Sequence, residues 1–270
     1  MQIMKGKSGY KARLRGREAK FISLGGALIA PTNELDMEYI SNFKNIILNL
    51  INRKRFSFVI VCGGGQIARS NQRARLALNP NITDEELDLV GIEATRSNAK
   101  RIAGIFGVKA YQRIIHNLND IFVADKKVIT TGGSGHGHST DYVTAILAFK
   151  SGAKSMINLS NIDYVYEKDP KKNGKGGRGI KKMSWAQYMK MIPKSWKPGL
   201  SAPFDPIASK AACERNLEVV LLSGYNLKNL ESYLNGESFV GTRIKNGLPL
   251  EYHPTTKKFQ ETRVFSSLSC

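Results

Sequence analysis

The sequence predicts an α/β protein in which a central, mainly parallel sheet carries helices on both faces. Two observations lead to this prediction. Short apolar runs alternate with longer amphipathic runs along the chain, and two of the apolar runs, 21–24 and 59–62, end directly in consecutive glycines. Alternating strands and helices are typical of parallel sheets. Ligands bind at the carboxyl ends of such strands, where these glycines lie.

The strands are predicted from short runs of β-branched and other apolar residues. In chain order they are 21–24, 56–62, 128–131, 156–159 and 218–222. The connecting segments are long enough for helices, which a parallel sheet needs for its crossovers. The sequence therefore predicts helices on both faces of one sheet.

The helices are predicted from apolar spacing and from capping residues. In chain order they are 36–53, 66–77, 84–106, 140–150, 205–215 and 227–234. Thr83 and Glu86 form a capping box before the third helix, and Asn226 can cap the last one. Gly152 stands at a suitable position to end the helix at 140–150.

The composition is that of a globular protein without a membrane segment. Of the 270 residues, 41% are hydrophobic, and no apolar run reaches the ~18 residues of a spanning helix. The N-terminus lacks the apolar region of a signal peptide. Cys62, Cys213 and Cys270 are odd in number and widely spaced, which indicates reduced thiols and no metal motif. We therefore expect a cytoplasmic protein, with Cys62 as a buried core residue.

The formal net charge of +19 is concentrated in residues 1–20 and 170–200. One interpretation is a surface for a polyanion such as RNA or the ribosome. The other is a positive entrance for phosphorylated substrates, which we favour for 170–200. For 1–20 the two interpretations are equally good. We predict a basic N-terminal tail over 1–20, one domain over 21–244 and a C-terminal tail over 245–270.

Glycines at a strand end let the backbone approach a phosphate closely. Gly25 and Gly26 follow the first predicted strand, and a run of three glycines follows the second. Two such strand ends suggest two phosphate sites, which phosphoryl transfer between two phosphorylated molecules requires. Neither cluster has the G-x-G-x-x-G or G-x-x-x-x-G-K-[ST] pattern, which weakens dehydrogenase and P-loop interpretations.

Four stretches in order carry a more specific signal. They are Leu24-Gly-Gly26, Cys62-Gly-Gly-Gly-Gln-Ile-Ala-Arg69, Gly132-Gly-Ser-Gly-His-Gly-His-Ser-Thr-Asp141 and Ser160-Asn-Ile-Asp-Tyr-Val-Tyr-Glu-Lys-Asp-Pro170. Over about 20–244 the chain resembles the amino acid kinase superfamily, and within it the archaeal-type uridylate kinases. The resemblance implies a three-layer sandwich around a mainly parallel sheet. It also implies phosphorylation of UMP to UDP by ATP with Mg²⁺, in pyrimidine nucleotide biosynthesis, by a hexamer.

The resemblance assigns an acceptor site to particular residues. They are Gly63, Gly64, Gly65, Arg69, Asp88, Ser139 and Thr140. Arg69 would grip the α-phosphate, since a guanidinium matches phosphate oxygens bidentately. Asp88 would hold the ribose hydroxyls, although a surface acid on a helix is an equally good interpretation. Ser139 and Thr140 precede a helix, where free N–H groups can bind an anion.

The resemblance also implies catalytic and ATP-binding residues. The catalytic set is Lys210, Asp141, Gly25 and Gly26, and the ATP-binding set is Asn161, Asp163, Tyr166 and Asp169. Lys210 would neutralise phosphate charge, Asp141 would organise phosphate-binding lysines, and the two glycines would donate N–H groups to the transferring phosphate. The alternatives are an N-cap role for Asp141, a solvated Lys210 and a core position for Tyr166. His136 and His138 are expected to line the acceptor pocket, and no metal-ligating residue is expected.

Three positions depart from the family pattern. Ser23 stands where many members carry a lysine, Ala27 where a serine is typical, and Tyr164 where a glycine is usual. Two alternatives therefore stay open. One is a kinase with another phosphorylated acceptor, such as isopentenyl phosphate, although the histidine typical of that group is absent from Gln66-Ile-Ala-Arg69. The other is an inactive kinase fold with an RNA- or ribosome-binding basic surface.

Overall fold

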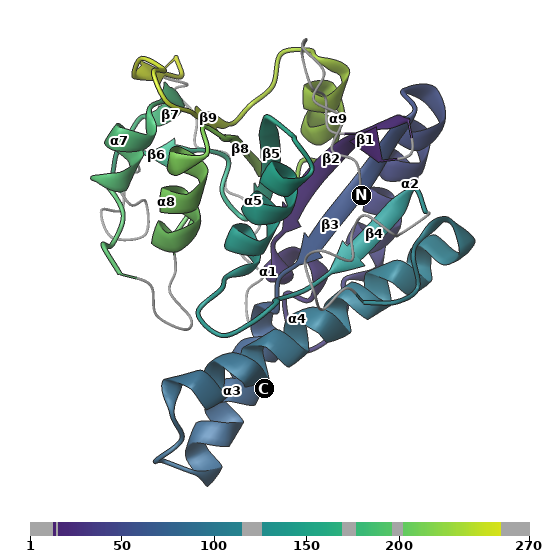
Figure 1. Cartoon of the computed structure of the whole chain (residues 1–270), viewed down its shortest axis with the longest axis vertical. Coiled ribbons are helices and arrows are strands. Elements are labelled where there is room, and N and C mark those ends of the chain that lie inside the picture. The colour runs from purple at the N-terminus through teal and green to yellow at the C-terminus, as the bar shows by residue number, and fades with distance from the viewer. Residues whose placement is uncertain (1–12, 15, 115–125, 169–176, 196–201, 255–270) are drawn as a thin grey trace, which may run out of the picture.

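The computed structural model describes residues 13–14, 16–114, 126–168, 177–195 and 202–254, which form one α/β sandwich (Figure 1). Within these residues, the strands form one sheet in the order β10-β7-β9-β8-β5-β2-β3-β4. The parallel centre consists of β2 (Arg17–Leu24), β3 (Phe56–Cys62), β4 (Val128–Thr131), β5 (Ser155–Ser160) and β8 (Glu218–Ser223). All five have neighbours running in the same direction, as the alternating pattern predicts.

Shorter strands extend this centre on one side. They are β9 (Thr242–Ile244), β7 (Gly179–Met183), β6 (Val165–Tyr166) and β10 (Glu251–Tyr252), and β1 (Arg13–Leu14) pairs with the start of β2. β9 runs antiparallel to β8, and β6 and β10 run antiparallel to β7. The sheet is therefore mainly parallel at its centre and mixed at this side.

Helices cover both faces of the sheet, which gives the three layers. One face carries α2 (Met37–Arg53), α4 (Asp84–Phe106) and α9 (Leu227–Asn235), and the other carries α5 (Thr140–Lys150), α7 (Trp185–Met189) and α8 (Pro206–Glu214). Alternate residues of one strand serve the two cores: Phe21 packs with the α5 side and Ile22 with the α2 side. The predicted fold class is confirmed.

Two helices begin at the carboxyl ends of the central strands. α1 (Gly26–Ile29) follows β2, and α3 (Gly65–Leu78) follows β3. The short helix η1 (Gly107–Lys109) continues α4 toward β4. In Figure 1, α3 and α4 extend together beyond the sheet at its carboxyl end.

The first strand begins four residues earlier than the sequence predicts. Residues 17–20, three of which are charged, suggest a tail, but Glu18 lies opposite Phe56 of β3 in the sheet and Ala19 is buried. The charges are accommodated because Lys20 forms an ion pair with Glu18 at 2.7 Å. Near the other end of the chain, β10 lies inside the predicted C-terminal tail, and Glu251 pairs with Lys181 and Lys182.

The basic segment 170–200 is more structured than its charge suggests. Among its described residues, Trp185 is fully buried and donates its indole N–H to the carbonyl of Leu217 at 3.0 Å. The hydrogen bonds from Lys181 and Lys182 lower the pKa of Glu251 to about 2. Part of this segment is therefore folded into the sheet and its α7 layer.

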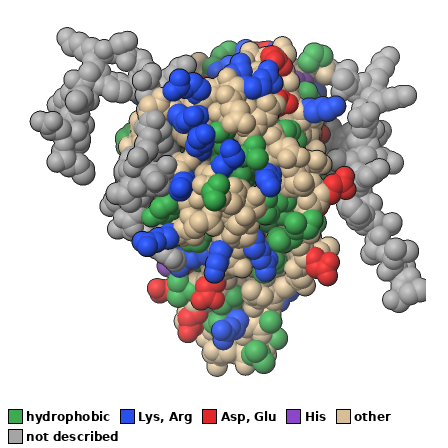
Figure 2. Space-filling model, turned by 90° about the vertical axis from the view of Figure 1, so that its right-hand side faces the viewer, with side chains coloured by type: hydrophobic (Ala, Val, Ile, Leu, Met, Phe, Trp, Pro, Cys, Tyr) green, Lys and Arg blue, Asp and Glu red, His purple; other side chains and the backbone are tan. Residues whose placement is uncertain are grey.

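No helix among the described residues is long and apolar enough to cross a membrane. Figure 2 shows the side of the molecule at the right of Figure 1, where Lys and Arg side chains spread over the upper part and acidic side chains lie around the rim and lower end. Cys62 is fully buried, as predicted, and burial raises the pKa of its thiol.

Candidate active site

The two glycine clusters lie side by side at the carboxyl ends of neighbouring parallel strands. The N–H of Gly63 donates to the carbonyl of Leu24 at 2.9 Å, and the N–H of Gly25 donates to the carbonyl of Leu159 at 2.9 Å. The ends of β2, β3 and β5 are thereby joined by backbone hydrogen bonds. The structure brings the two clusters into one continuous backbone surface.

These glycines are required by their contact with one another. A Cβ on Gly26 would lie 2.1 Å from the nitrogen of Gly65 and 2.6 Å from the carbonyl carbon of Gly63. Gly65 also has φ +61°, a conformation that favours glycine. The sequence suggests glycines that approach a ligand, and the structure adds that the two turns approach each other.

Asn98 supports the second glycine cluster from α4. Its side-chain amide donates to the carbonyl of Gly63 at 2.9 Å and also reaches the carbonyl of Gly64 at 3.4 Å. Asn98 is fully buried. Sequence reasoning missed it, although a signal existed: Asn98 lies four residues before Ile102, on the apolar face of the helix.

Asp141, in the first turn of α5, is the centre of a polar network. It accepts hydrogen bonds from the hydroxyl of Ser23 on β2 at 2.7 Å and from the amide of Asn158 on β5 at 2.8 Å. Ser23 thus places a hydroxyl beside this carboxylate at the position where many family members carry a lysine. Asn158 was missed, but a polar residue inside an otherwise apolar strand was its signal.

A second carboxylate lies next to this network. Asp205 caps α8 by accepting from the backbone N–H groups of Ile207 and Ala208, and its other oxygen accepts from the hydroxyl of Ser139. Asp205 was not among the predicted site residues, because an aspartate before proline and a helix is explained by capping alone. Ser139 in turn caps α5 by accepting from the N–H of Tyr142.

The two carboxylates disfavour each other's charge. Burial, with a smaller contribution from the nearby Asp205, raises the pKa of Asp141 to about 7. Burial also raises the pKa of Asp205. A positive group brought to this end of the sheet would stabilise the ionised forms. The site is therefore prepared for cations or for a ligand that carries them.

The raised pKa of Asp141 predicts that the stability of the free protein decreases as pH rises. The folded state favours the protonated carboxyl, so the contribution is fully present below about pH 4 and is lost as pH rises through about 7. At about 1.4 kcal/mol per unit of pKa shift, the loss is on the order of 4 kcal/mol as an upper bound. Denaturant unfolding between pH 4 and 8 should show this decrease, and Asp141→Asn should flatten it. Parallel profiles for the two proteins would contradict the prediction.

The glycine-rich loop after β4 is attached to α4. Asp88 accepts from the N–H of Gly137 at 2.7 Å and lies 3.1 Å from Nδ1 of His136. Asp88 is only 7% exposed, so the surface-acid alternative does not describe it. His138 stacks on Tyr142 with ring centroids 4.5 Å apart. Asp88 thus faces the loop predicted to line the acceptor pocket.

The predicted cationic residues are exposed. Arg69 is the fifth residue of α3, shortly after the glycines, and its Nε donates to the side-chain oxygen of Gln66 at 3.1 Å. Lys210 is exposed on α8, the helix that Asp205 joins to Ser139. Thr140 is the partly buried first residue of α5. The structure thus places their backbones around the carboxyl end of the sheet and leaves both charged side chains in solvent.

The predicted ATP segment follows β5. Asn161 is exposed, whereas Asp163 and Tyr166 are partly buried. Burial raises the pKa of Tyr166 to about 12, with a further contribution from Asp163. Tyr164 packs on His253, with ring centroids 4.1 Å apart, and meets the ring of Tyr166 edge-on. Asp169 lies outside the described residues.

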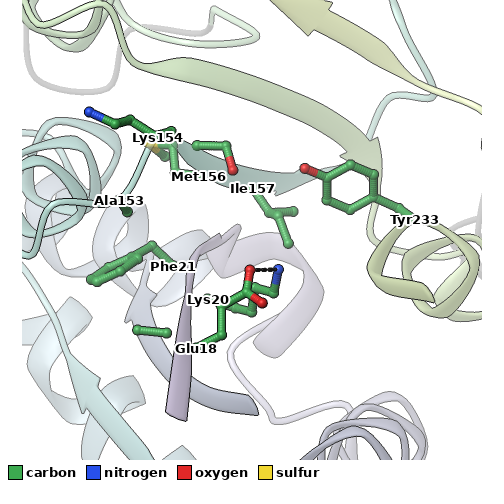
Figure 3. A pocket seen from close by; sticks show the side chains of 10 residues that line it. Glu18, Lys20, Phe21, Ala153, Lys154, Met156, Ile157 and Tyr233 are labelled. Atoms are coloured by element: carbon green, nitrogen blue, oxygen red, sulfur yellow. Dashed lines mark hydrogen bonds and ion pairs between the residues drawn. The ribbon is translucent and has the colours of Figure 1, made fainter. Parts of the chain in front are cut away.

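A small pocket of about 100 Å³ lies elsewhere, between the amino ends of β2 and β5 (Figure 3). Glu18, Lys20, Lys154 and Tyr233 are among its lining side chains. These residues are at the opposite ends of the strands from the glycines, so this pocket is separate from the candidate active site. Among the described residues, no group of three or more His, Cys, Asp or Glu side chains is placed to hold a metal ion.

Comparisons with known proteins agree with this geometry. The amino acid kinase family matches residues 19–223. Uridylate kinase from Methanobrevibacter smithii is 34% identical over 83% of this chain and 97% of its own length, and that from Pyrococcus abyssi is 28% identical over 79% and 94%. The crystal structure of uridylate kinase from Archaeoglobus fulgidus superposes with a TM-score of 0.70 at 26% identity, covering 83% of this chain and 98% of that one. UMP kinase from Bacillus anthracis shares the fold, with a TM-score of 0.68 at 20% identity. With the glycine turns of β2 and β3 joined above one parallel sheet, and a family match over most of its length, this chain belongs to the amino acid kinase family.

Proposed function

We propose that this chain transfers the γ-phosphoryl group of ATP to UMP, giving ADP and UDP. The supporting observation is the single backbone surface formed by the glycine turns of β2 and β3 beside the buried Asp141 network. Relatives named uridylate kinase match 83% and 85% of this chain at 34% and 30% identity. Two phosphorylated molecules can meet on one such surface with their phosphates adjacent.

The proposed mechanism depends on positioning and charge neutralisation. The N–H of Gly26 holds the transferring phosphoryl group, whereas the N–H of Gly25 is already donated to the carbonyl of Leu159. The 63–65 turn with Arg69 fixes the phosphate of UMP. Lys210 moves from solvent onto the phosphates and neutralises the charge that develops during transfer. The acceptor is already an anion, so no general base is required. Asp141 orients the cationic groups from its position between Ser23 and Asn158.

The remaining assignments concern the two nucleotides. Asp88, Ser139 and Thr140 complete the UMP side, and the 161–169 segment holds ATP. Mg²⁺ entering with ATP would be held chiefly by phosphate oxygens and water, as is usual for this ion, and would supply charge neutralisation. The oxygen-rich surroundings of Asp141, with serine hydroxyls and an amide, are compatible with that hydrated ion. We also propose a cytoplasmic hexamer, which light scattering would detect as about six times 29.9 kDa.

The departures from the family pattern are compatible with activity in this proposal. Ser23 satisfies one oxygen of Asp141 in place of a lysine. The ring of Tyr164 packs on His253 and on the backbone of Gly179. A Cβ on Gly179 would lie 2.8 Å from the Tyr164 ring. Ala27 removes one hydroxyl donor and leaves the backbone N–H groups of α1 in place.

A coupled ADP-release assay with Mg-ATP tests the function. UMP, CMP, GMP, dUMP and isopentenyl phosphate are offered separately to the purified protein. We expect turnover with UMP, and none with isopentenyl phosphate. Turnover with isopentenyl phosphate alone would show that this compound, and not UMP, is the acceptor, and the assignment of the fold would stand. A folded protein that turns over none of these acceptors would overturn the proposal in favour of a scaffold.

A further inference from the structure

A row of basic side chains lies at the amino ends of the parallel strands, opposite the candidate active site. We define this basic edge by Arg17, Lys20, Arg53, Lys54, Arg55, Lys109, Arg113, Lys126, Lys127 and Lys154. Among the described residues of these segments, the acidic residue is Glu18, which pairs with Lys20. None of these cations belongs to the proposed phosphoryl-transfer site. The basic edge is therefore a feature that the proposed kinase function does not use.

Backbone contacts show that the row is continuous across the sheet. The N–H of Phe58 donates to the carbonyl of Lys127 at 2.8 Å, which places the turn before β4 beside the turn before β3. The guanidinium of Arg17 donates to the carbonyl of Ile51 at 3.1 Å, which joins the start of β2 to the end of α2. The N–H of Tyr111 donates to the carbonyl of Val128, which holds the segment after η1 beside the start of β4.

Most of these charges lack an acidic partner within the described residues. Lys20 and Arg53 form ion pairs, with Glu18 at 2.7 Å and with Glu231 at 3.8 Å. The described structure contains no ion pair for Lys54, Lys126 or Lys127, and Lys54 and Lys126 are exposed. Unpaired cations in a row produce a positive potential that attracts polyanions.

The amino ends of these strands lie toward one side of the molecule. The arrows of β3 and β4 point toward α3 in Figure 1, so their amino ends lie toward the right, which is the side that Figure 2 presents. Lys and Arg side chains predominate on its upper part. The seven residues of β3, at ~3.3 Å each, separate the row from the glycine turns by roughly 20 Å. Binding at the two ends of the sheet can therefore be separated experimentally.

We propose that the basic edge binds the phosphate backbone of single-stranded RNA. The row crosses β4, β3, β2 and β5, whose spacing of ~4.8 Å gives about 15 Å, enough for several consecutive phosphates. A single row of cations suits one backbone, whereas a duplex presents two. The cavity beside Lys20 and Lys154 is about 100 Å³, too small for a nucleotide, so the phosphates bind on the surface. Binding is independent of sequence and strongly dependent on salt.

The experiment neutralises the centre of the row in the full chain. The test variant carries Lys54→Gln, Arg55→Gln, Lys126→Gln and Lys127→Gln. Fluorescence anisotropy with a labelled single-stranded RNA of about 20 nucleotides measures affinity between 50 and 300 mM salt. The wild type should bind, and the variant should bind at least about 20-fold more weakly at ~100 mM salt. The slope of log K against log[salt] should become less steep by about 3, at ~0.7 for each lost phosphate contact.

A matched variant controls for net charge. Arg73→Gln, Arg75→Gln, Lys190→Gln and Lys194→Gln remove the same charge from exposed positions on α3 and after α7. This control should bind RNA nearly as well as the wild type. Both variants should keep the wild-type unfolding midpoint, and the test variant should keep the wild-type ATP turnover. Equal weakening in both variants, or wild-type binding by the test variant, overturns the assignment to the basic edge. So does absence of RNA binding, or tighter binding to duplex DNA or to anionic phospholipid vesicles.

Discussion

Replacing Gly26 by alanine is expected to destabilise the protein by at least about 3 kcal/mol and to abolish phosphoryl transfer. A Cβ at this position would lie 2.1 Å from the nitrogen of Gly65 and within 2.7 Å of the carbonyl of Gly63. Both neighbours are backbone, so no side chain can rotate away. Overpacking against side chains commonly costs 1–3 kcal/mol, and a contact with fixed backbone belongs at or above the upper end of that range. The free energy of unfolding from denaturant titration measures the effect.

The loss of activity follows from geometry. To admit the methyl group, the β2 and β3 turns must separate, and both turns carry proposed phosphate-binding N–H groups. A displacement of about 1 Å at such groups can reduce the rate about 100-fold. The ADP-release assay should therefore show a loss larger than the unfolded fraction explains, at a temperature where the variant is folded.

Gly104→Ala is the matched control. Gly104 lies in the last turns of α4, and a Cβ there would meet nothing within 4 Å. Alanine is preferred to glycine in a helix, so this variant should be more stable by about 0.5–1 kcal/mol and fully active. If Gly26→Ala behaves like Gly104→Ala, the close packing of the two turns is not what makes Gly26 necessary.

Local patterns were enough to predict the layers of the fold. The predicted boundaries of α2 and α4 agree with the structure because Asp36 and the Thr83–Glu86 capping box mark their first residues. Consecutive β-branched residues predicted β3, whose seven residues are all buried. In each case the signal lies within a few residues of the element, where single-sequence reasoning has access to it.

The mixed side of the sheet and part of the site depend on contacts between distant residues. β7 is held by β9 and β10, and its exposed Lys181 is explained only by Glu251 near the other end of the chain. Likewise, Ser23 and Asp141 are 118 residues apart. No local pattern shows that these two side chains meet. The strand-end glycines indicated where the site lies, and the resemblance named its residues, but the supporting hydrogen bonds required the structure.

Lys210→Ala is expected to lower kcat by about 10²–10³ and to leave stability unchanged. Loss of one contact that stabilises transition-state charge typically costs ~2–4 kcal/mol of barrier. Lys210 is exposed on α8, so its removal should change the free energy of unfolding by no more than about 0.5 kcal/mol. Steady-state kinetics with Mg-ATP and UMP, beside denaturant unfolding, measure both quantities.

The comparison with Lys228→Ala distinguishes a catalytic lysine from a solvated one. Lys228 is also exposed, on α9, which lies on the other face of the sheet. Its removal should leave kcat within about twofold, because exposed charges contribute little. Lys210→Arg keeps the charge but changes its shape, and should recover part of the lost rate. If Lys210→Ala and Lys228→Ala have the same kcat, Lys210 is a solvated helix residue, and the charge of the transferring phosphate must be neutralised by Arg69 and the metal-bound nucleotide.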